Sequence, residues 1–572
     1  MTQPCDSPFS AWNPGIESEI PAALREQETI FRSDNVSTSY SDVTELAAQF
    51  GLKLEDLIVF KPARLALHEM IVRVSATLSI PEGETEADLG LAFRKITLHI
   101  LNTYAEGKML ELEQGYATLS AEIAQQVAEI LAKSIFASQN KPAAKNTSWL
   151  SRLFKPRKPA PAVNLESKQE RDYRIISEFK DKSKLADSAQ QRQIYRSLHK
   201  VLGTISSHCG QLASDQSLLT RLCSNHALNA FASRWIGRQL DPLFQQAIAQ
   251  EGYQIAPNDP DSVLVSLKGA SAAGKSSSRP ALKEKYFSSR DKDYITISPD
   301  IWRRLLLDYD SLGNAYKYAG RFTSLEVNVI DDKLDRFILS RAERDKAIPN
   351  IMVDRFRFDS FTTDIVTHLL RNTYAKYLST LHMVFVITPP EETVVRGWER
   401  GLRNGRYKSA EDFLGHSVEA YTGMPNLFLR WLKAQQPDFR YRFVDNSVAK
   451  GQPPLLIAHG DKNEINILRP AGFINVVRFQ KINVQAKNPQ AVYPPDEQLA
   501  VARNTKFLEE TIRAIPTVNF LSKDSEKPFA FCKNSRLTIT DTATFKDAVK
   551  DEETHAIFVA LFPTETKAAI DP

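Results

Sequence analysis

The spacing of apolar residues along the chain predicts two kinds of structure. From about residue 42 to 137, and again from 166 to 250, apolar residues recur every three or four positions, as in ARLALHEMIVRVSATL (63–78) and ALNAFASRWIGRQL (227–240). This period lets one face of a helix pack against a core. Both stretches are therefore predicted to be helical.

Residues 262–447 instead alternate short apolar runs with helical patterns, which is typical of a parallel sheet with connecting helices. The predicted strands are SVLVSL (262–267), YITIS (294–298), NIMVD (350–354), MVFVIT (383–388) and YRFVD (441–445). Beyond residue 455 the predicted strands are PFAFCKN (528–534), SRLTIT (535–540) and HAIFVALF (555–562), around a helix at 542–551.

The first of these strands leads directly into the sequence GASAAGKS at residues 269–276. The pattern G-x-x-x-x-G-K-[ST] behind a strand indicates a P-loop, whose small residues let backbone N–H groups turn toward phosphate oxygens. Lys275 is expected to contact the β- and γ-phosphates, and Ser276 to offer its hydroxyl to Mg²⁺. The predicted nucleotide-binding residues of this loop are Gly269, Ala270, Ser271, Ala272, Ala273, Gly274, Lys275, Ser276 and Ser277. Pro280 is expected to kink or shorten the helix that follows.

Changes of composition mark the predicted domain boundaries. We predict an extended arm at residues 1–40, a helical domain at 41–137, a Pro-rich basic linker at 138–165, a P-loop domain at 166–455 and a small α/β domain at 456–572. The helices of residues 166–250 are expected to pack on the sheet of the P-loop domain. The predicted fold class is multidomain α+β, with a central P-loop α/β domain containing a parallel sheet, a helical N-terminal domain and a small α/β C-terminal cap.

The overall charge and the cysteine content narrow the class of protein. Among 572 residues, 73 Lys and Arg face 69 Asp and Glu, so the net charge of +4 does not indicate a nucleic-acid-binding protein. The 4 cysteines are sparse, which argues against a disulfide scaffold and for a reducing compartment. The N-terminus shows no Sec-type signal pattern. We expect a cytoplasmic protein, or one secreted into a host cell without a Sec signal.

Two carboxylates follow predicted strands, where ligands of such sheets bind. Asp300 can accept the proton of an attacking hydroxyl, or it can merely cap the helix that begins at Ile301. Asp354 ends an apolar strand in the manner of a Walker B motif and is expected, with Ser276, to hold Mg²⁺. The alternative for Asp354 is a pair with Arg355 or Arg357 that holds a substrate loop.

Four arginines occur in the stretch RGWERGLRNGR (396–406), namely Arg396, Arg400, Arg403 and Arg406. Spacings of four and three place the first three on one helical face. Gathering like charges costs free energy unless an anion offsets them, and a triphosphate is a suitable anion. The alternative is a solvated basic helix face. Asn446, after the last strand, lies where an adenine ring often binds.

Together these motifs resemble the zeta-toxin-like kinases, a branch of the P-loop kinases, over about residues 262–450. The resemblance depends on GKSS (274–277), SPDIWR (298–303), VFVITPPEETVVRGWER (384–400) and VDN (444–446). It implies that the central domain is a kinase domain that uses ATP or GTP and Mg²⁺. The acceptor would be a hydroxyl of a nucleotide-type metabolite, such as a nucleotide-sugar or a dinucleotide, often in a bacterial toxin or effector.

The resemblance also implies roles for individual residues. Lys275 would bind the β- and γ-phosphates, and Asp300 would be the catalytic base. Arg396, with Arg403 or Arg406, would clamp the moving phosphoryl group, and Arg400 would help to bind the nucleotide. The residues expected to contact the acceptor are Arg303, Glu326, Asp354 and Arg355.

Two other functions stay open from the sequence. One is a polynucleotide hydroxyl kinase, which the near-neutral charge does not favour. The other is a nucleotide-regulated interaction protein without kinase turnover. The expected partners are a small nucleotide-type substrate and a protein bound through the helical N-terminal domain, with nucleic acid not expected. The linker is expected to be solvated, and the alternative is membrane contact by its basic segment 148–158.

Overall fold

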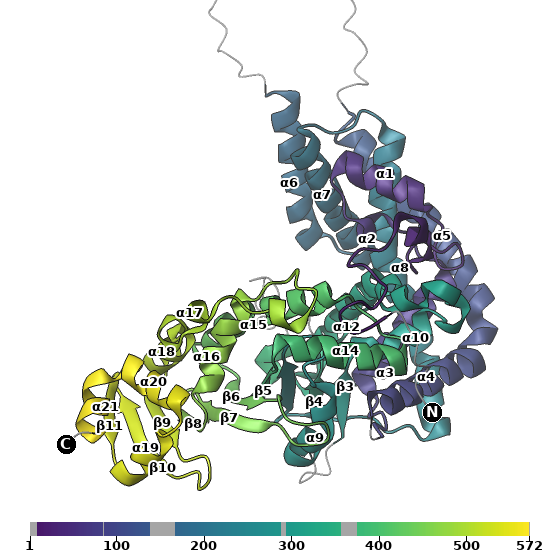
Figure 1. Ribbon diagram of the computed structural model, residues 1–572. Coiled ribbons are helices and arrows are strands. Elements are labelled where there is room, and N and C mark those ends of the chain that lie inside the picture. Colours follow the sequence, from purple (N-terminus) through teal and green to yellow (C-terminus); the bar gives the residue numbers. More distant parts are fainter. Residues whose placement is uncertain (1–8, 84, 138–165, 288–292, 356–373, 571–572) are drawn as a thin grey trace, which may run out of the picture. The chain divides into compact units, whose positions relative to one another are not determined.

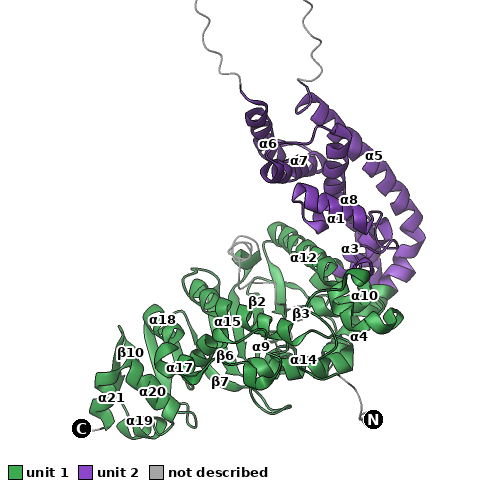
Figure 2. Cartoon of the chain, turned by 45° about the horizontal axis from the view of Figure 1, so that its top comes forward, with its two compact units in different colours: residues 1–24, 72–98, 251–572 green, residues 25–71, 99–250 purple. Residues whose placement is uncertain are grey.

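The computed structural model describes residues 9–83, 85–137, 166–287, 293–355 and 374–570 (Figure 1). It divides into two compact units, each made of stretches that are separate in sequence (Figure 2). Unit 1 comprises residues 1–24, 72–98 and 251–572, and unit 2 comprises residues 25–71 and 99–250. The linker at 138–165, with its segment 148–158, lies outside the described residues.

Unit 2 is built from helices, as the apolar spacing predicts. In α7, for example, Ile194, Leu198, Val201, Leu202 and Ile205 are buried and lie along one face. Its helices are α1 (Tyr40–Phe50), α2 (Leu54–Leu57), most of α3 (Pro62–Thr77), α5 (Met109–Lys133), α6 (Lys168–Leu185), α7 (Ala189–Cys209) and α8 (Gln216–Glu251).

The helices of residues 166–250 differ from the prediction in their packing. Helix α7 contacts α1, α5 and α6, and the Asn229 side chain of α8 donates to the backbone carbonyl of Ile58. These helices therefore form one helical unit with the N-terminal helices. The prediction that they pack on the sheet of the P-loop domain is wrong. Apolar periodicity shows that a helix has a buried face but does not show what covers that face.

Unit 1 is built on one mixed sheet whose parallel part includes the P-loop strand. The described strands are β1 (Asn258–Asp259), β2 (Val263–Lys268), β3 (Tyr294–Ile297), β4 (Ile348–Val353), β5 (Thr380–Ile387), β6 (Asp438–Asp445), β7 (Leu455–Asp461), β8 (Glu464–Ile467), β9 (Thr517–Leu521), β10 (Pro528–Lys533) and β11 (Arg536–Ile539). Strands β3, β4, β2, β5 and β6 lie side by side in that order and are parallel. All of β2 is buried, which explains why its sequence is mostly apolar. The predicted parallel strands are therefore confirmed.

Helices connect and cover this sheet. Those of the described part of unit 1 are α4 (Glu86–Ile100, mostly in this unit), α9 (Arg279–Phe287), α10 (Arg303–Leu306), α11 (Ala319–Phe322), α12 (Ser324–Asp345), α14 (Pro390–Asn404), α15 (Ala410–Leu432), α16 (Ala471–Arg478), α17 (Asp496–Leu499), α18 (Lys506–Ala514), α19 (Thr542–Ala548), α20 (Glu552–Leu561) and α21 (Pro563–Ile570). The chain leaves the P-loop in a 3₁₀ turn, Ser276–Ser278, and becomes α-helical only at Arg279. Pro280 thus occupies the first turn of a short helix, where a missing N–H is tolerated.

The C-terminal residues continue the same sheet rather than forming the separate small domain predicted from residue 456. Strand β7 pairs with β6 in antiparallel fashion, and the ladder runs on to β11. Phe443 of β6 also packs against Phe473 and Phe507, with ring centroids 5.1 and 5.9 Å apart. The predicted strand at 555–562 is wrong. It lies in α20, where Thr554, Ile557 and Phe558 are buried at helical spacing behind the N-cap Asp551.

Residues 72–98 are tied to unit 1 by hydrogen bonds. The backbone N–H of Ser79 donates to Gln254 at 2.9 Å, and Thr296 of β3 donates to the Glu82 carboxylate at 2.8 Å. Arg341 of α12 donates to the carbonyl of Ala76 at 3.0 Å. These contacts fix the start of α4 beside the parallel strands. None of the described helices combines the length and apolar character needed to cross a bilayer.

Candidate active site

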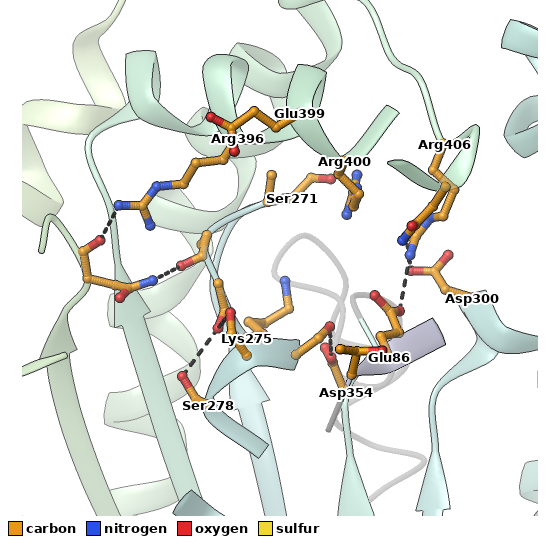
Figure 3. A pocket seen from close by; sticks show the side chains of 18 of the residues that line it. Glu86, Ser271, Lys275, Ser278, Asp300, Asp354, Arg396, Glu399, Arg400 and Arg406 are labelled. Atoms are coloured by element: carbon orange, nitrogen blue, oxygen red, sulfur yellow. Dashed lines mark hydrogen bonds and ion pairs between the residues drawn. The ribbon is translucent and has the colours of Figure 1, made fainter. Parts of the chain in front are cut away.

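A cavity of about 1490 Å³ lies at the carboxyl ends of the parallel strands, around the P-loop (Figure 3). Ligands of open α/β sheets bind at such strand ends. The P-loop, the ends of β3 and β4, helix α14 and the loop after β6 all line the cavity, and the first turn of α4 adds Glu86. Most predicted site residues are thus brought together. Those lining the cavity are Ser271, Ala272, Ala273, Gly274, Lys275, Ser276, Ser277, Asp300, Arg303, Asp354, Arg355, Arg396, Arg400, Arg403, Arg406 and Asn446.

Close contacts with the ends of β5 and β6 shape the P-loop. Gly274 has φ +93°, and a Cβ atom there would lie 2.1 Å from the Asn446 amide nitrogen. That amide donates to the carbonyl of Ala273 at 2.8 Å, and Thr388 donates to the same carbonyl at 3.0 Å. Only glycine fits this position without strain. Asn446, predicted as an adenine contact, thus lines the cavity and also braces the loop.

Lys275 and Ser276 of the P-loop both line the cavity. The Lys275 side chain folds back onto its own loop, and its Nζ donates to the carbonyls of Gly269 and Ala270 at 3.0 and 2.9 Å. Burial lowers the pKa of this ammonium group, and the Asp354 carboxylate opposes that effect. Gly269 and Ala270 do not themselves line the cavity.

Ser276 and Asp354 come from different elements and meet side by side. Ser276 Oγ donates to Asp354 Oδ2 at 2.7 Å, and both residues line the cavity. A hydroxyl and a carboxylate are oxygen ligands of the kind that Mg²⁺ prefers, so this donor set fits the ion. Asp354 is buried at the end of β4, and its carboxylate accepts a hydrogen bond from the P-loop serine, whereas Arg355 binds Asp331 and Asp335. Arg357, the other predicted partner of Asp354, lies outside the described residues.

Asp300 is not a helix cap. The 3₁₀ turn after β3 begins at Pro299 without a side-chain cap, and the Asp300 carboxylate instead accepts hydrogen bonds from Arg303, at 2.8 Å, and from Arg406. Burial alone would raise the pKa of Asp300, but the guanidinium groups of Arg406 and Arg303 outweigh it and keep the pKa well below its usual range. Asp300 is therefore an ionised carboxylate with a fixed orientation.

The four arginines of the basic run differ in their surroundings. Arg396 donates to Glu392 at 2.5 Å and to the carbonyl of Asn446 at 2.7 Å, so it joins α14 to the loop after β6. Arg403 is exposed, and its Nε donates to its own helix.

Arg400 and Arg406 both line the cavity, and Figure 3 shows Arg406 directed toward Asp300. Arg406 donates to Asp300 and, at 3.0 Å, to Glu86. Within the described part of the chain, the buried Nε and one terminal nitrogen of Arg400 find no hydrogen-bond partner. Burial and the nearby Arg406 lower the pKa of Arg400 to about 10. Arg400 is therefore a cation that an incoming anion would stabilise.

Three predicted acceptor contacts have different environments. Arg303 lines the cavity but binds Asp300 and the hydroxyl of Thr323, at 2.7 Å. Arg355 lines it too, although its guanidinium is engaged by Asp331 and other side chains. Glu326 is buried in α12 and does not line the cavity. Their contact with an acceptor stays a prediction.

Glu86, Lys408 and His416 are among the cavity residues that sequence reasoning missed. Glu86 begins a helix far from the P-loop in sequence and has no local motif. Lys408 follows the arginine run by two residues, so extending that basic stretch would have included it. His416 lies two turns along the next helix, where a lone histidine gives no signal by itself.

The chain was compared with known proteins. No family model matches it, and no curated protein matches it. Among solved structures it is similar to a chain from the PezAT chromosomal toxin–antitoxin system of Streptococcus pneumoniae. That match has 17% sequence identity and a TM-score of 0.26, and it covers 37% of this chain and 79% of the other. Because the TM-score is low, we base the chemistry on the side chains around the cavity.

Proposed function

We propose that this protein is a Mg²⁺-dependent kinase that transfers the γ-phosphoryl group of ATP or GTP to a hydroxyl of a small nucleotide-type metabolite. The observation that supports this most directly is the hydrogen bond between Ser276 of the P-loop and Asp354 of β4, in the cavity that Lys275 and Asp300 also line. Phosphoryl transfer depends mainly on positioning and charge, and this cavity supplies both.

Each residue has a separate task in the proposed reaction. Lys275 leaves the two loop carbonyls and binds the β- and γ-phosphates. Arg400 and Arg406 stabilise the charge on the phosphoryl group as it moves. Asp300 accepts the proton of the acceptor hydroxyl. Its low pKa makes it a weak base, so its main contribution is to orient that hydroxyl.

The metal site is proposed on the same grounds. Ser276 and Asp354 would hold Mg²⁺, which neutralises phosphate charge when it is bound. Their hydrogen bond joins the turn after the P-loop to the end of β4. The large cavity leaves room for an acceptor beyond the triphosphate. A nucleotide-sugar or a dinucleotide is the proposed acceptor class, and a toxin or effector role is the proposed biological setting.

The test is incubation of the full chain with Mg²⁺, γ-labelled ATP or GTP, and a panel of nucleotide-sugars, dinucleotides and oligonucleotides, with mass spectrometry to detect an added phosphate. A phosphorylated small molecule is expected with the wild-type protein and not with Lys275→Ala. Transfer only to oligonucleotides would favour a polynucleotide kinase. Nucleotide binding without transfer to any acceptor would favour a nucleotide-regulated interaction protein. Unchanged transfer by Lys275→Ala would rule out this site.

A further inference from the structure

Lys408 lines the cavity but has no part in the mechanism above. It lies in the loop between α14 and α15, and its Nζ is 3.3 Å from the hydroxyl of Ser271 and 3.2 Å from Nδ1 of His416. Ser271 belongs to the P-loop, whose backbone would surround the phosphates. Lys408 therefore reaches the phosphate site from outside the loop, while Lys275 reaches it from within.

The groups around Lys408 are mostly cationic. Arg400 of α14, Arg406 of the same loop and Arg303 of α10 act on it with like charge, and Asp300 at the end of β3 opposes them. On α15, His416 and Glu419 interact with it. Asp412 of α15 is bound by Arg321. Without an anion, the site has more positive charge than its carboxylates balance.

This excess charge acts on the proton of Lys408. Burial, with Arg400 as the next cause, lowers the pKa of Lys408 to about 7. Lys408 and burial in turn keep the pKa of His416 well below its ordinary value. The imidazole is therefore neutral. Because an ammonium group can only donate, Nδ1 of His416 accepts from Lys408 whenever Lys408 is protonated.

We propose that Lys408 is a second phosphate-contacting lysine, and that it takes up one proton from solvent when a nucleoside triphosphate binds. This inference rests on the proposed function, since it uses the same P-loop. His416 would orient the amine, and the contact with Ser271 would be exchanged for one with a phosphate oxygen. The negative charge of the ligand would favour the ammonium form, so binding of nucleotide and of proton would be linked.

The link between proton binding and nucleotide binding determines how nucleotide affinity changes with pH. The bound form keeps a proton that the free form has largely lost above pH 7, so nucleotide affinity must fall as the pH rises. The expected slope approaches about tenfold weaker binding per pH unit between about pH 7.5 and about pH 9. A site whose cations stay charged over this range would show no such slope.

The experiment is isothermal titration calorimetry of the full chain with the Mg²⁺ complex of a non-hydrolysable ATP analogue at about pH 8, in buffers of different ionisation enthalpy. The wild-type protein is expected to take up between about half a proton and one proton per nucleotide. Lys408→Arg places a permanently charged group at the site and is expected to abolish the uptake. Lys408→Met is expected to bind at least about tenfold more weakly at pH 7, because one charge-assisted phosphate contact is lost.

Lys506→Met is the matched control, because Lys506 is exposed at the start of α18 and lines no part of the cavity. It is expected to match the wild-type protein in affinity and proton uptake. Circular dichroism melts would confirm that each variant is folded. Equal proton uptake by wild type and Lys408→Arg, or equal affinity of wild type and Lys408→Met, would overturn the inference.

A different experimental result would reject the proposed function. If Lys275→Ala loses binding while Lys408→Met binds like the wild-type protein, the P-loop assignment stands and only the role of Lys408 is rejected. If the wild-type protein binds no nucleotide at all, both proposals are rejected together.

Discussion

Asp300 accepts a hydrogen bond from Arg406, and this pair joins the end of β3 to the loop between α14 and α15. The two residues are 106 positions apart in sequence. The arginine orients the carboxylate and keeps it ionised, at the cost of making it a weaker base. The pair therefore favours positioning of the acceptor hydroxyl over strong proton abstraction.

Replacing Asp300 by Asn tests this role. The amide has the same size but can no longer accept the acceptor proton, so we expect the chemical step to slow by roughly 10²–10⁴-fold. Nucleotide affinity should change much less, because Lys275 is intact. Single-turnover transfer and nucleotide titration on the same preparation would separate the two effects. A wild-type rate would show that Asp300 is not the acceptor-side carboxylate.

The pH dependence of stability follows from the lowered pKa of Asp300. A carboxyl group whose folded-state pKa lies below its unfolded value of about 3.9 stabilises the fold above that value. This contribution is lost as the pH falls through the folded-state pKa. The difference in unfolding free energy between the wild-type protein and Asp300→Asn should therefore be constant from about pH 7 to about pH 5 and shrink below about pH 4. Chemical denaturation at several pH values would measure it. A difference that already shrinks near pH 6 would contradict the ion pair with Arg406.

Asp354→Asn tests the metal site. The amide can still accept a hydrogen bond from Ser276 but lacks the negative charge that attracts Mg²⁺. We expect the Mg²⁺ concentration for half-maximal transfer to rise by about tenfold or more, with nucleotide still bound. Ser276→Ala should act in the same direction. An unchanged Mg²⁺ requirement in both variants would exclude this pair as ligands.

Gly274→Ala tests the shape of the P-loop. A methyl group there meets the Asn446 amide and is also strained at φ +93°. We expect nucleotide binding to be lost and the unfolding free energy to fall by about 1–3 kcal/mol.

Gly210→Ala, at the end of α7, is the matched control for this change. Gly210 has φ +73° but nothing within 4 Å of an added Cβ. Gly210→Ala should lower the unfolding free energy by about 1 kcal/mol, through backbone strain alone, and should leave nucleotide binding intact. Equal nucleotide affinity in the two variants would mean that the contact with Asn446 does not shape the site.

Local patterns in the sequence predicted the elements that carry the site. Strand β2 is buried along its whole length, so its sequence is mostly apolar, and the P-loop directly follows it. Strands β3 and β4 are also buried, so their ends could be predicted from the sequence. Asp300 and Asp354 follow these ends and line the cavity. Parallel strands share one carboxyl edge, so residues at their ends meet without any further information.

What the sequence could not predict depends on contacts between distant segments. Nothing near Glu86 indicates that its carboxylate lies 3.0 Å from Arg406. The roles of the arginines are equally non-local, because Arg400 differs from Arg396 only in what surrounds it. The error at residues 555–562 was local instead. An apolar run of that length fits a strand or a helix, and the N-cap Asp551 was the overlooked signal.

Unit 1 is assembled from three stretches of the chain, and the two stretches of unit 2 lie between them in sequence. A fragment that starts at residue 251 would lack Glu82 and Glu86, so Thr296 and Arg406 would each lose an acidic partner. During synthesis, the early residues 72–98 must wait until the ribosome has passed residue 406 before that ion pair can form. Limited proteolysis within residues 99–250 would therefore yield two pieces that stay associated. Activity is then expected from the complex of the two pieces and not from either piece alone.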